Sequence, residues 1–150
     1  MSAVYVDYEI SEDNARVDFE TVHGWLSNSY WSPGVGMDVV CRAAANSSLV
    51  ISVFEHGSGK QIGYGRVISD KATFGYLADI YVDEAFRGKG IGKAIVKFAL
   101  EHPDHQGFRR WTLGTMDAHG VYEQCGFGPL MYPDRMMEYR LSSQVVSKTT

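Results

Sequence analysis

Residues 81–93 carry a β-rich run into three alternating glycines and then into an amphipathic helix. The segment reads Tyr81-Val82-Asp83-Glu84-Ala85-Phe86-Arg87-Gly88-Lys89-Gly90-Ile91-Gly92-Lys93. A helix N-terminus presents unpaired N–H groups and about half a positive charge, and glycines let an anion approach the backbone closely. Because three glycines at a helix start cost stability without such a use, the segment predicts a phosphate cradle, with Arg87, Lys89 and Lys93 adding charge. The alternative is a plain strand-to-helix turn with a solvated basic face.

Two common phosphate motifs do not fit this segment. A Walker A loop needs Ser or Thr after Gly-Lys, but Gly92-Lys93 is followed by Ala94. A dinucleotide fingerprint needs a third glycine three residues after the second, where this chain has Lys93. The sequence therefore excludes both of these classes of site.

The rest of the chain alternates between helical and strand periodicities. Helical spacing covers residues 19–26, 37–44 and 91–100, and a short helix follows from Asp117, its expected N-cap, to Tyr122, closed by a left-handed Gly126. Strands are expected at 4–8, 49–55, 61–69, 73–82 and 110–114, with a last pair around Leu130 and Tyr139. The expected element order is β-α-α-β-β-β-α-β-α-β-β.

Length and composition indicate one globular domain over residues 1–150, with a polar tail at 142–150. The net charge of −4 argues against nucleic acid and anionic lipid as partners. No apolar run approaches the roughly 20 residues that span a bilayer, and Cys41 and Cys125 fit neither a disulfide framework nor a zinc site. We therefore expect a soluble cytoplasmic protein with two free thiols.

Two motifs in the expected order identify a family. Arg87-x-x-Gly90-x-Gly92 follows a long apolar strand, and Tyr122-Glu123-Gln124-Cys125-Gly126-Phe127 lies downstream. In both motifs, and in its element order from Ala3 to Leu141, the chain resembles the GNAT acyltransferase superfamily. The resemblance implies an α/β fold with a mixed central sheet of about seven strands, helices on both faces and a cleft between splayed fourth and fifth strands. It also implies acetyl-CoA as the donor, and dimers are common in the family, so a homodimer is a further expectation.

The resemblance implies positions for the donor. The backbone amides of Arg87 through Gly92, which include Gly88, Lys89, Gly90 and Ile91, would hold the pyrophosphate of acetyl-CoA. Ile80, Tyr81 and Val82 would offer backbone pairing to the pantetheine arm, and residues 113–115 would form the other wall of the cleft. A β-bulge near Tyr81 would direct an N–H at the thioester carbonyl.

Transfer to an amine requires a base for the ammonium and an acid for the departing thiolate. Tyr122 is the candidate acid, because the family places this tyrosine beside the sulfur, and the alternative is a core aromatic. Asp79 interrupts an apolar strand, so it is either the base or amine anchor, or the acceptor of a structural hydrogen bond. Asp117 and His119 belong to an Asp-Ala-His segment that resembles one branch of the family. Asp117 is either catalytic or an N-cap, and His119 is a second candidate base.

The acceptor pocket of this fold is built largely by the first two helices and their loop. Those segments offer His23, Trp25, Tyr30 and Trp31, each of which could instead be core, and an aromatic wall suits cations or rings. No histidine cluster has metal-ligand spacing, so we expect no metal. The sequence predicts an N-acetyltransferase acting on a small primary amine by direct attack. The alternatives are acetylation of a protein lysine or N-terminus, and a non-catalytic acyl-CoA sensor.

Overall fold

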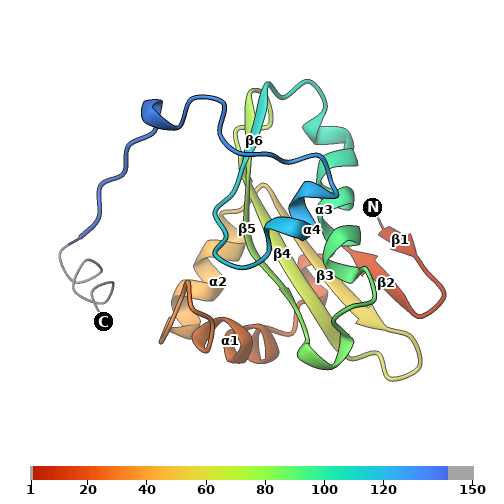
Figure 1. Cartoon of the computed structure of the whole chain (residues 1–150). Helices are drawn as coiled ribbons and strands as arrows, with labels where there is room; N and C mark the ends of the chain where they lie inside the picture. The colour runs from red at the N-terminus through yellow and green to blue at the C-terminus, as the bar shows by residue number, and fades with distance from the viewer. Residues whose placement is uncertain (1, 142–150) are drawn as a thin grey trace.

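A six-stranded mixed sheet forms the centre of the molecule in the computed structural model, which describes residues 2–141 (Figure 1). The strands are β1 (Ser2–Val4), β2 (Tyr8–Ser11), β3 (Leu49–Glu55), β4 (Gln61–Ser69), β5 (Phe74–Val82) and β6 (Arg110–Thr112). They lie side by side in chain order, and every neighbouring pair is antiparallel except β5 and β6, which are parallel. The helices are α1 (Phe19–Ser27), α2 (Met37–Ala45), α3 (Ile91–Glu101) and α4 (His119–Glu123). The mixed α/β fold class is confirmed.

The sheet is covered on both faces because its central strands are apolar on both sides. Ile51 and Val53 of β3 belong to a core shared with α3, whereas Val50, on the opposite face, packs into a second core with α1 and α2. Alternate residues of a strand point to opposite faces, so these two cores require helices on both sides. Figure 1 shows α1 and α2 on one side of the sheet and α3 and α4 on the other.

A β-bulge interrupts β5 where it pairs with β4. Tyr81 pairs with Tyr64 and Ala78 pairs with Arg66, so Asp79 and Ile80 together face the single residue Gly65. Asp79 has a φ of 55°, which is the left-handed region that few residues adopt. A Cβ atom on Gly65 would lie 2.6 Å from Ile80 Cδ1, so glycine makes room for the extra residue. The bulge expected near Tyr81 is therefore present, centred on Asp79 and Ile80.

The expected strands are wrong at both ends of the described chain, and the sheet has six strands in place of about seven. The first strand is a hairpin, in which Tyr5 donates its N–H to the Tyr8 carbonyl at 2.8 Å and the two rings stack. Val6 therefore lies in a turn. Residues 128–141 contain no strand, because Pro129 and Pro133 cannot donate to a ladder and a 3-10 turn covers Pro133–Arg135. The expected tail at 142–150 lies outside the described residues.

None of the helices within residues 2–141 has the length and apolar character that crossing a membrane requires.

Candidate functional site

A gap opens between β5 and β6 because these strands pair over only three residues. Phe74, Gly75 and Tyr76 pair with residues 110–112, which are the whole of β6, and the chain after Thr112 no longer pairs with β5. Trp111 secures the paired end, since a Cβ atom on Gly75 would lie 2.6 Å from its ring. Beyond Tyr76, the β5 edge that faces the gap has no strand partner among residues 2–141. The expected cleft lies between the fourth and fifth expected strands, which are β5 and β6 here, and it opens where β6 ends.

The start of α3 forms an open backbone cradle at one end of β5. Gly88 and Gly90 have φ values of 79° and 80°, and Gly90 is the N-cap of α3 without a side-chain capping bond. A Cβ atom placed on either glycine would meet no other atom within 4 Å. The turn into α3 therefore has open space beside Gly88 and Gly90, and the first-turn amides that follow lack intrahelical partners, as at any helix N-terminus.

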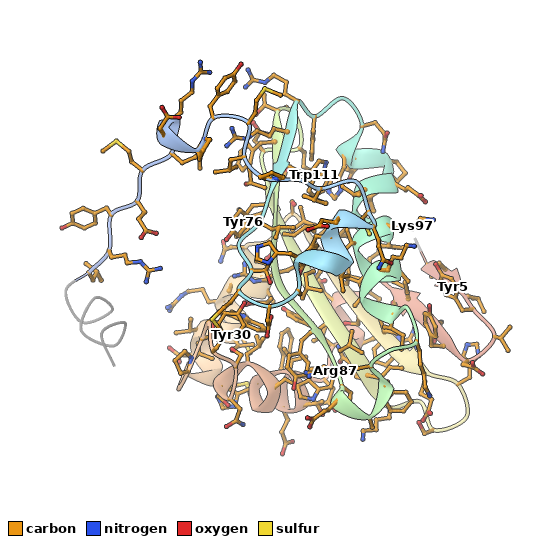
Figure 2. All side chains as sticks on the ribbon, in the orientation of Figure 1. Tyr5, Tyr30, Tyr76, Arg87, Lys97 and Trp111 are labelled. Carbon is orange, nitrogen blue, oxygen red and sulfur yellow. The ribbon has the colours of Figure 1, made fainter. Side chains whose placement is uncertain are left out.

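The basic side chains near this cradle are partly engaged elsewhere. Arg87, labelled in Figure 2, donates from Nε to the Val82 carbonyl at 3.0 Å, and its guanidinium lies 5.1 Å from the centre of the Tyr81 ring. The Lys89 ammonium lies 5.3 Å from the Phe86 ring, and Lys93 is exposed on α3. Backbone amides, more than these cations, thus define the cradle.

Tyr122 lies on α4 and is fixed by the end of that helix. Phe127 donates its N–H to the Tyr122 carbonyl at 3.1 Å, and Gly126 donates to the Glu123 carbonyl at 3.0 Å. These bonds form a Schellman motif, in which Gly126 has the predicted left-handed conformation with a φ of 99°. Burial raises the pKa of the Tyr122 phenol to about 12, and the nearby Tyr30 and Asp117 add to the shift. Tyr122 is therefore a neutral hydrogen-bond donor at pH 7.

Asp117 precedes α4, and His119 is the first residue of that helix. The N-cap of α4 is Ala118, whose N–H donates to Thr115 Oγ1 at 3.1 Å, so the predicted capping role of Asp117 is wrong. His119 is exposed in the first turn of α4, and it lines a cavity of about 470 Å³ together with Tyr122. No three His, Cys, Asp or Glu side chains within residues 2–141 are placed to hold a metal ion.

Asp79, at the bulge, has a donor on each carboxylate oxygen. Trp31 donates from Nε1 to Oδ1 at 2.9 Å, and Arg66 donates from Nε to Oδ2 at 2.7 Å. Arg66 and Asp79 are both largely buried, and a buried carboxylate is stable only when it is paired in this way. These contacts favour a structural role for Asp79, as a hydrogen-bond acceptor, over a role as the base. They also join the bulge to the α1–α2 loop.

Aromatic side chains from α1, the α1–α2 loop and β5 gather beside the gap. Trp25 stacks on Tyr81 with ring centres 5.0 Å apart, and Trp31 lies 6.5 Å from the same ring. Tyr30 packs edge-to-face on Trp31 at 5.0 Å and accepts a hydrogen bond at its hydroxyl from the Met116 N–H at 2.8 Å. The loop is thereby tied across the gap to the segment that leads from β6 to α4.

His23 is set apart from this cluster. Its Nε2 atom contacts the Val35 carbonyl at 2.9 Å, which links α1 to the segment before α2. The structure therefore brings Trp25, Tyr30 and Trp31 together near the gap but does not bring His23 there.

Arg66 and Tyr76 are absent from the sequence-based set, and the sequence predicts Tyr81 there for its backbone and not for its ring. Arg66 pairs with Asp79, Tyr76 is close enough to Tyr122 to affect its pKa, and the Tyr81 ring joins the aromatic cluster. Figure 2 labels Tyr30 and Tyr76. An arginine facing an aspartate across two neighbouring apolar strands is a signal that could have identified Arg66.

Residues 8–127 match the acetyltransferase (GNAT) family. A glucosamine 6-phosphate N-acetyltransferase from Arabidopsis thaliana is 30% identical over 92 residues, which cover 57% of this chain and 62% of that protein. The match thus spans less than two thirds of that relative.

Solved structures extend the likeness to most of the chain. A GNAT-family protein from Xanthomonas campestris pv. campestris has a TM-score of 0.83 and 39% identity, covering 89% of this chain and 93% of that one. The glucosamine-6-phosphate N-acetyltransferase of Arabidopsis thaliana has a TM-score of 0.63 and 22% identity, covering 90% of this chain and 98% of that one. The second likeness concerns the fold alone.

Proposed function

The chain belongs to the GNAT acetyltransferase family, and from this membership we propose that it transfers an acetyl group from acetyl-CoA to a primary amine of a small molecule. The observation that carries the proposal is the half-buried Tyr122, whose phenol lines the cavity beside the gap between β5 and β6. A non-catalytic acyl-CoA sensor needs no such proton donor.

The cradle at α3 fits the pyrophosphate of acetyl-CoA. Its glycines leave space above the backbone, and its free amides provide donors for phosphate oxygens. The β5 edge from Ile80 to Val82 provides main-chain groups for the pantetheine arm, as in β-strand addition. When bound, acetyl-CoA supplies an acetyl group activated as a thioester.

In this proposal Tyr122 is the general acid. The amine nitrogen bonds to the acetyl carbon, the carbon–sulfur bond breaks, and the Tyr122 phenol donates its proton to the departing thiolate. Proton transfer by a positioned group contributes about 10²–10⁴-fold to a rate. A phenol is protonated at pH 7, so Tyr122 carries a proton that it can donate.

His119 takes the proton that the amine loses, directly or through water. Of the candidate bases, Asp79 has both oxygens engaged by Trp31 and Arg66, whereas His119 lines the same cavity as Tyr122. His119 and Tyr122 are three residues apart on α4, which places them on one helix face. Asp79 therefore acts as a positioning residue that orients Trp31.

The aromatic cluster forms the acceptor wall. Trp25, Trp31 and Tyr81 offer ring faces, which attract alkylammonium groups and stack on planar groups. The Tyr30 bond to Met116 closes this wall over the gap, which favours a small acceptor over a lysine within a protein.

The test measures thiol release from acetyl-CoA with separate classes of amine: glucosamine 6-phosphate, polyamines, aminoglycosides, aryl-alkylamines, amino acids and lysine peptides. Turnover on a small amine supports the proposal. Turnover on peptides alone supports the protein-acetylation alternative, and heat protection by acetyl-CoA without turnover on any class supports the sensor alternative.

A further inference from the structure

His105 ends the 3-10 turn Pro103–His105 that follows α3, and it is a buried histidine that the proposed chemistry does not use. The residue is only 3% exposed. Its Nδ1 contacts the carbonyl of Ala99 in α3, and because a carbonyl only accepts hydrogen bonds, Nδ1 carries the ring proton of the neutral imidazole. Nε2 is therefore the unprotonated nitrogen, and it is buried without a hydrogen-bond partner among residues 2–141.

Aromatic side chains surround the His105 ring. Its centre lies 5.2 Å from that of the Phe108 ring and 5.1 Å from that of Trp111 in β6, which meets it edge-to-face. Ala99 and these two rings do not titrate, so they supply no opposite charge to a protonated imidazole. Transfer of a charge from water into such surroundings is unfavourable unless the charge is paired.

The ionisable groups that act on His105 are paired with other residues. They are His102 and Asp104 in the same turn and Lys71 in the turn between β4 and β5. Asp104 pairs with Lys71 at 3.8 Å. His102 lies 5.0 Å from His105, ring centre to ring centre, and its Nε2 contacts the Glu12 carboxylate at 2.9 Å. A second proton on His105 would therefore be a buried positive charge without a counter-ion of its own.

Burial lowers the pKa of the His105 imidazole from its ordinary value of 6.5. The neighbouring His102 and Lys71 act in the same direction, and the bond to Ala99 and the charge of Asp104 oppose them. In the unfolded chain the imidazole has its ordinary pKa, so below about pH 6.5 unfolding takes up a proton. The stability that His105 contributes is therefore present above about pH 6.5 and is lost as the pH falls from there toward the lower pKa of the folded chain.

Trp111, labelled in Figure 2, connects His105 to the gap between β5 and β6. The ring that meets His105 also covers Gly75, where a Cβ atom would lie 2.6 Å from it. Trp111 and Gly75 are paired in the short ladder between the two strands. Trp111 also lines the cavity of about 470 Å³ beside Tyr122. A change in the surroundings of His105 therefore acts on the paired end of the gap.

We propose that His105 is a pH-sensitive switch: in acid a proton adds to Nε2, the imidazolium leaves its aromatic surroundings, and β6 loosens from β5. The proton comes from solvent, no bond between heavy atoms forms or breaks covalently, and loss of the proton restores the packed state. The proposal concerns the folded chain alone and does not rest on acetyl transfer.

The first test is a pH titration of the histidine rings of the unmodified chain by nitrogen-15 NMR. The His105 ring is identified by its contact with the Trp111 ring. We expect its proton on Nδ1 at pH 7 and a titration midpoint below 6.5. A proton on Nε2 at pH 7, or a midpoint at or above 6.5, would overturn the proposal.

The second test is urea unfolding between pH 7.5 and pH 5 with two matched variants. His105→Asn keeps an amide donor for the Ala99 carbonyl but removes the ring that titrates. The control is His56→Asn, because His56 Nδ1 also contacts a backbone carbonyl, that of Val6 at 2.9 Å, but the residue is exposed. Each proton taken up on unfolding raises the unfolding constant by up to about tenfold per pH unit. We expect the unmodified chain and His56→Asn to lose stability below pH 6.5 by this amount more steeply than His105→Asn, and equal slopes in all three chains would refute the switch.

Hydrogen exchange on the same chains locates the opening. Protection of the amides of residues 110–112 is compared at pH 7.5 and pH 5.5, after correction for the intrinsic pH dependence of exchange. We expect protection to fall in acid in the unmodified chain and in His56→Asn, but not in His105→Asn. Protection that does not change in the unmodified chain, or that falls equally in His105→Asn, would overturn the link to β6. Because no measurement uses acetyl-CoA or an amine, an inactive enzyme could still have this switch and an active one could lack it.

Discussion

Tyr122 is the residue on which the proposed chemistry depends most. Removing its hydroxyl in Tyr122→Phe keeps the ring that packs on Phe127 but removes the proton donor. We expect kcat to fall about tenfold or more, since positioned acids contribute about 10²–10⁴-fold. The control is Tyr132→Phe, which removes the hydroxyl of a half-exposed tyrosine that packs on Arg135. Equal kcat values for Tyr122→Phe and the unmodified chain would remove Tyr122 from the mechanism.

The raised pKa of Tyr122 gives a second prediction. A phenol with the usual pKa of about 10 is half ionised at pH 10, whereas one with a pKa of about 12 remains almost fully protonated there. We therefore expect kcat to stay level between pH 8 and pH 10 at saturating substrates. If the unmodified chain lost half of its kcat by pH 10 and Tyr122→Phe did not, the pKa of the Tyr122 phenol would be the usual value of about 10.

Substitution of Asp79 distinguishes a structural role for this carboxylate from a role as the general base. In Asp79→Asn the side-chain oxygen can still accept from Trp31, but the charge that pairs with Arg66 is lost. We expect a stability loss of about 1–3 kcal/mol in urea unfolding and a higher KM for the amine, with the shape of the kcat/KM pH profile unchanged. The control Asp104→Asn removes an exposed pair with Lys71 and is expected to change stability by less than about 1 kcal/mol. Loss of the alkaline rise in kcat/KM in Asp79→Asn would instead make Asp79 the base.

At the scale of elements, the N-terminus of α3 is the part that we assign to acetyl-CoA. Gly90→Ala introduces a Cβ atom at a φ of 80°, where non-glycine residues cost about 1–2 kcal/mol. The matched control is Gly107→Ala, because Gly107 has a φ of 87° and equally open space but lies outside the cradle. We expect both variants to lose similar stability, while only Gly90→Ala weakens coenzyme A binding in calorimetric titration, by about tenfold, or 1.4 kcal/mol. Equal binding by the two variants would place the phosphate elsewhere.

Helices and strands with strong apolar periodicity could be predicted from the sequence. Hairpins and turns that depend on particular side-chain contacts or on proline could not. Helices α1, α2 and α3 and strands β3, β4 and β5 follow from their apolar spacing. The hairpin around Val6 depends on the stacking of Tyr5 on Tyr8, which alternation along one strand does not reveal. Apolar residues around Leu130 and Tyr139 favour strands there, but Pro129 and Pro133 cannot donate to a ladder, so no strand forms within residues 128–141.

At the scale of the whole molecule, the site joins segments that are far apart in the chain. The cradle and the Tyr122 motif are local, so residues 87–92 and 122–127 could be recognised from spacing and family resemblance. The bond from Trp31 to Asp79 spans 48 positions and the bond from Tyr30 to Met116 spans 86. Such contacts depend on the register of β4 and β5 and on the path of the α1–α2 loop, which no short pattern encodes.

The most direct test of the account follows both products of one reaction. Acetyl-CoA and each amine of the panel are incubated with the unmodified chain, Tyr122→Phe and Tyr132→Phe, and free thiol and N-acetylated amine are quantified by mass spectrometry. The account predicts equal amounts of the two products for one class of small amine, with a rate that falls about tenfold or more in Tyr122→Phe alone. Thiol release without an acetylated amine, or protection by acetyl-CoA without either product, would contradict it.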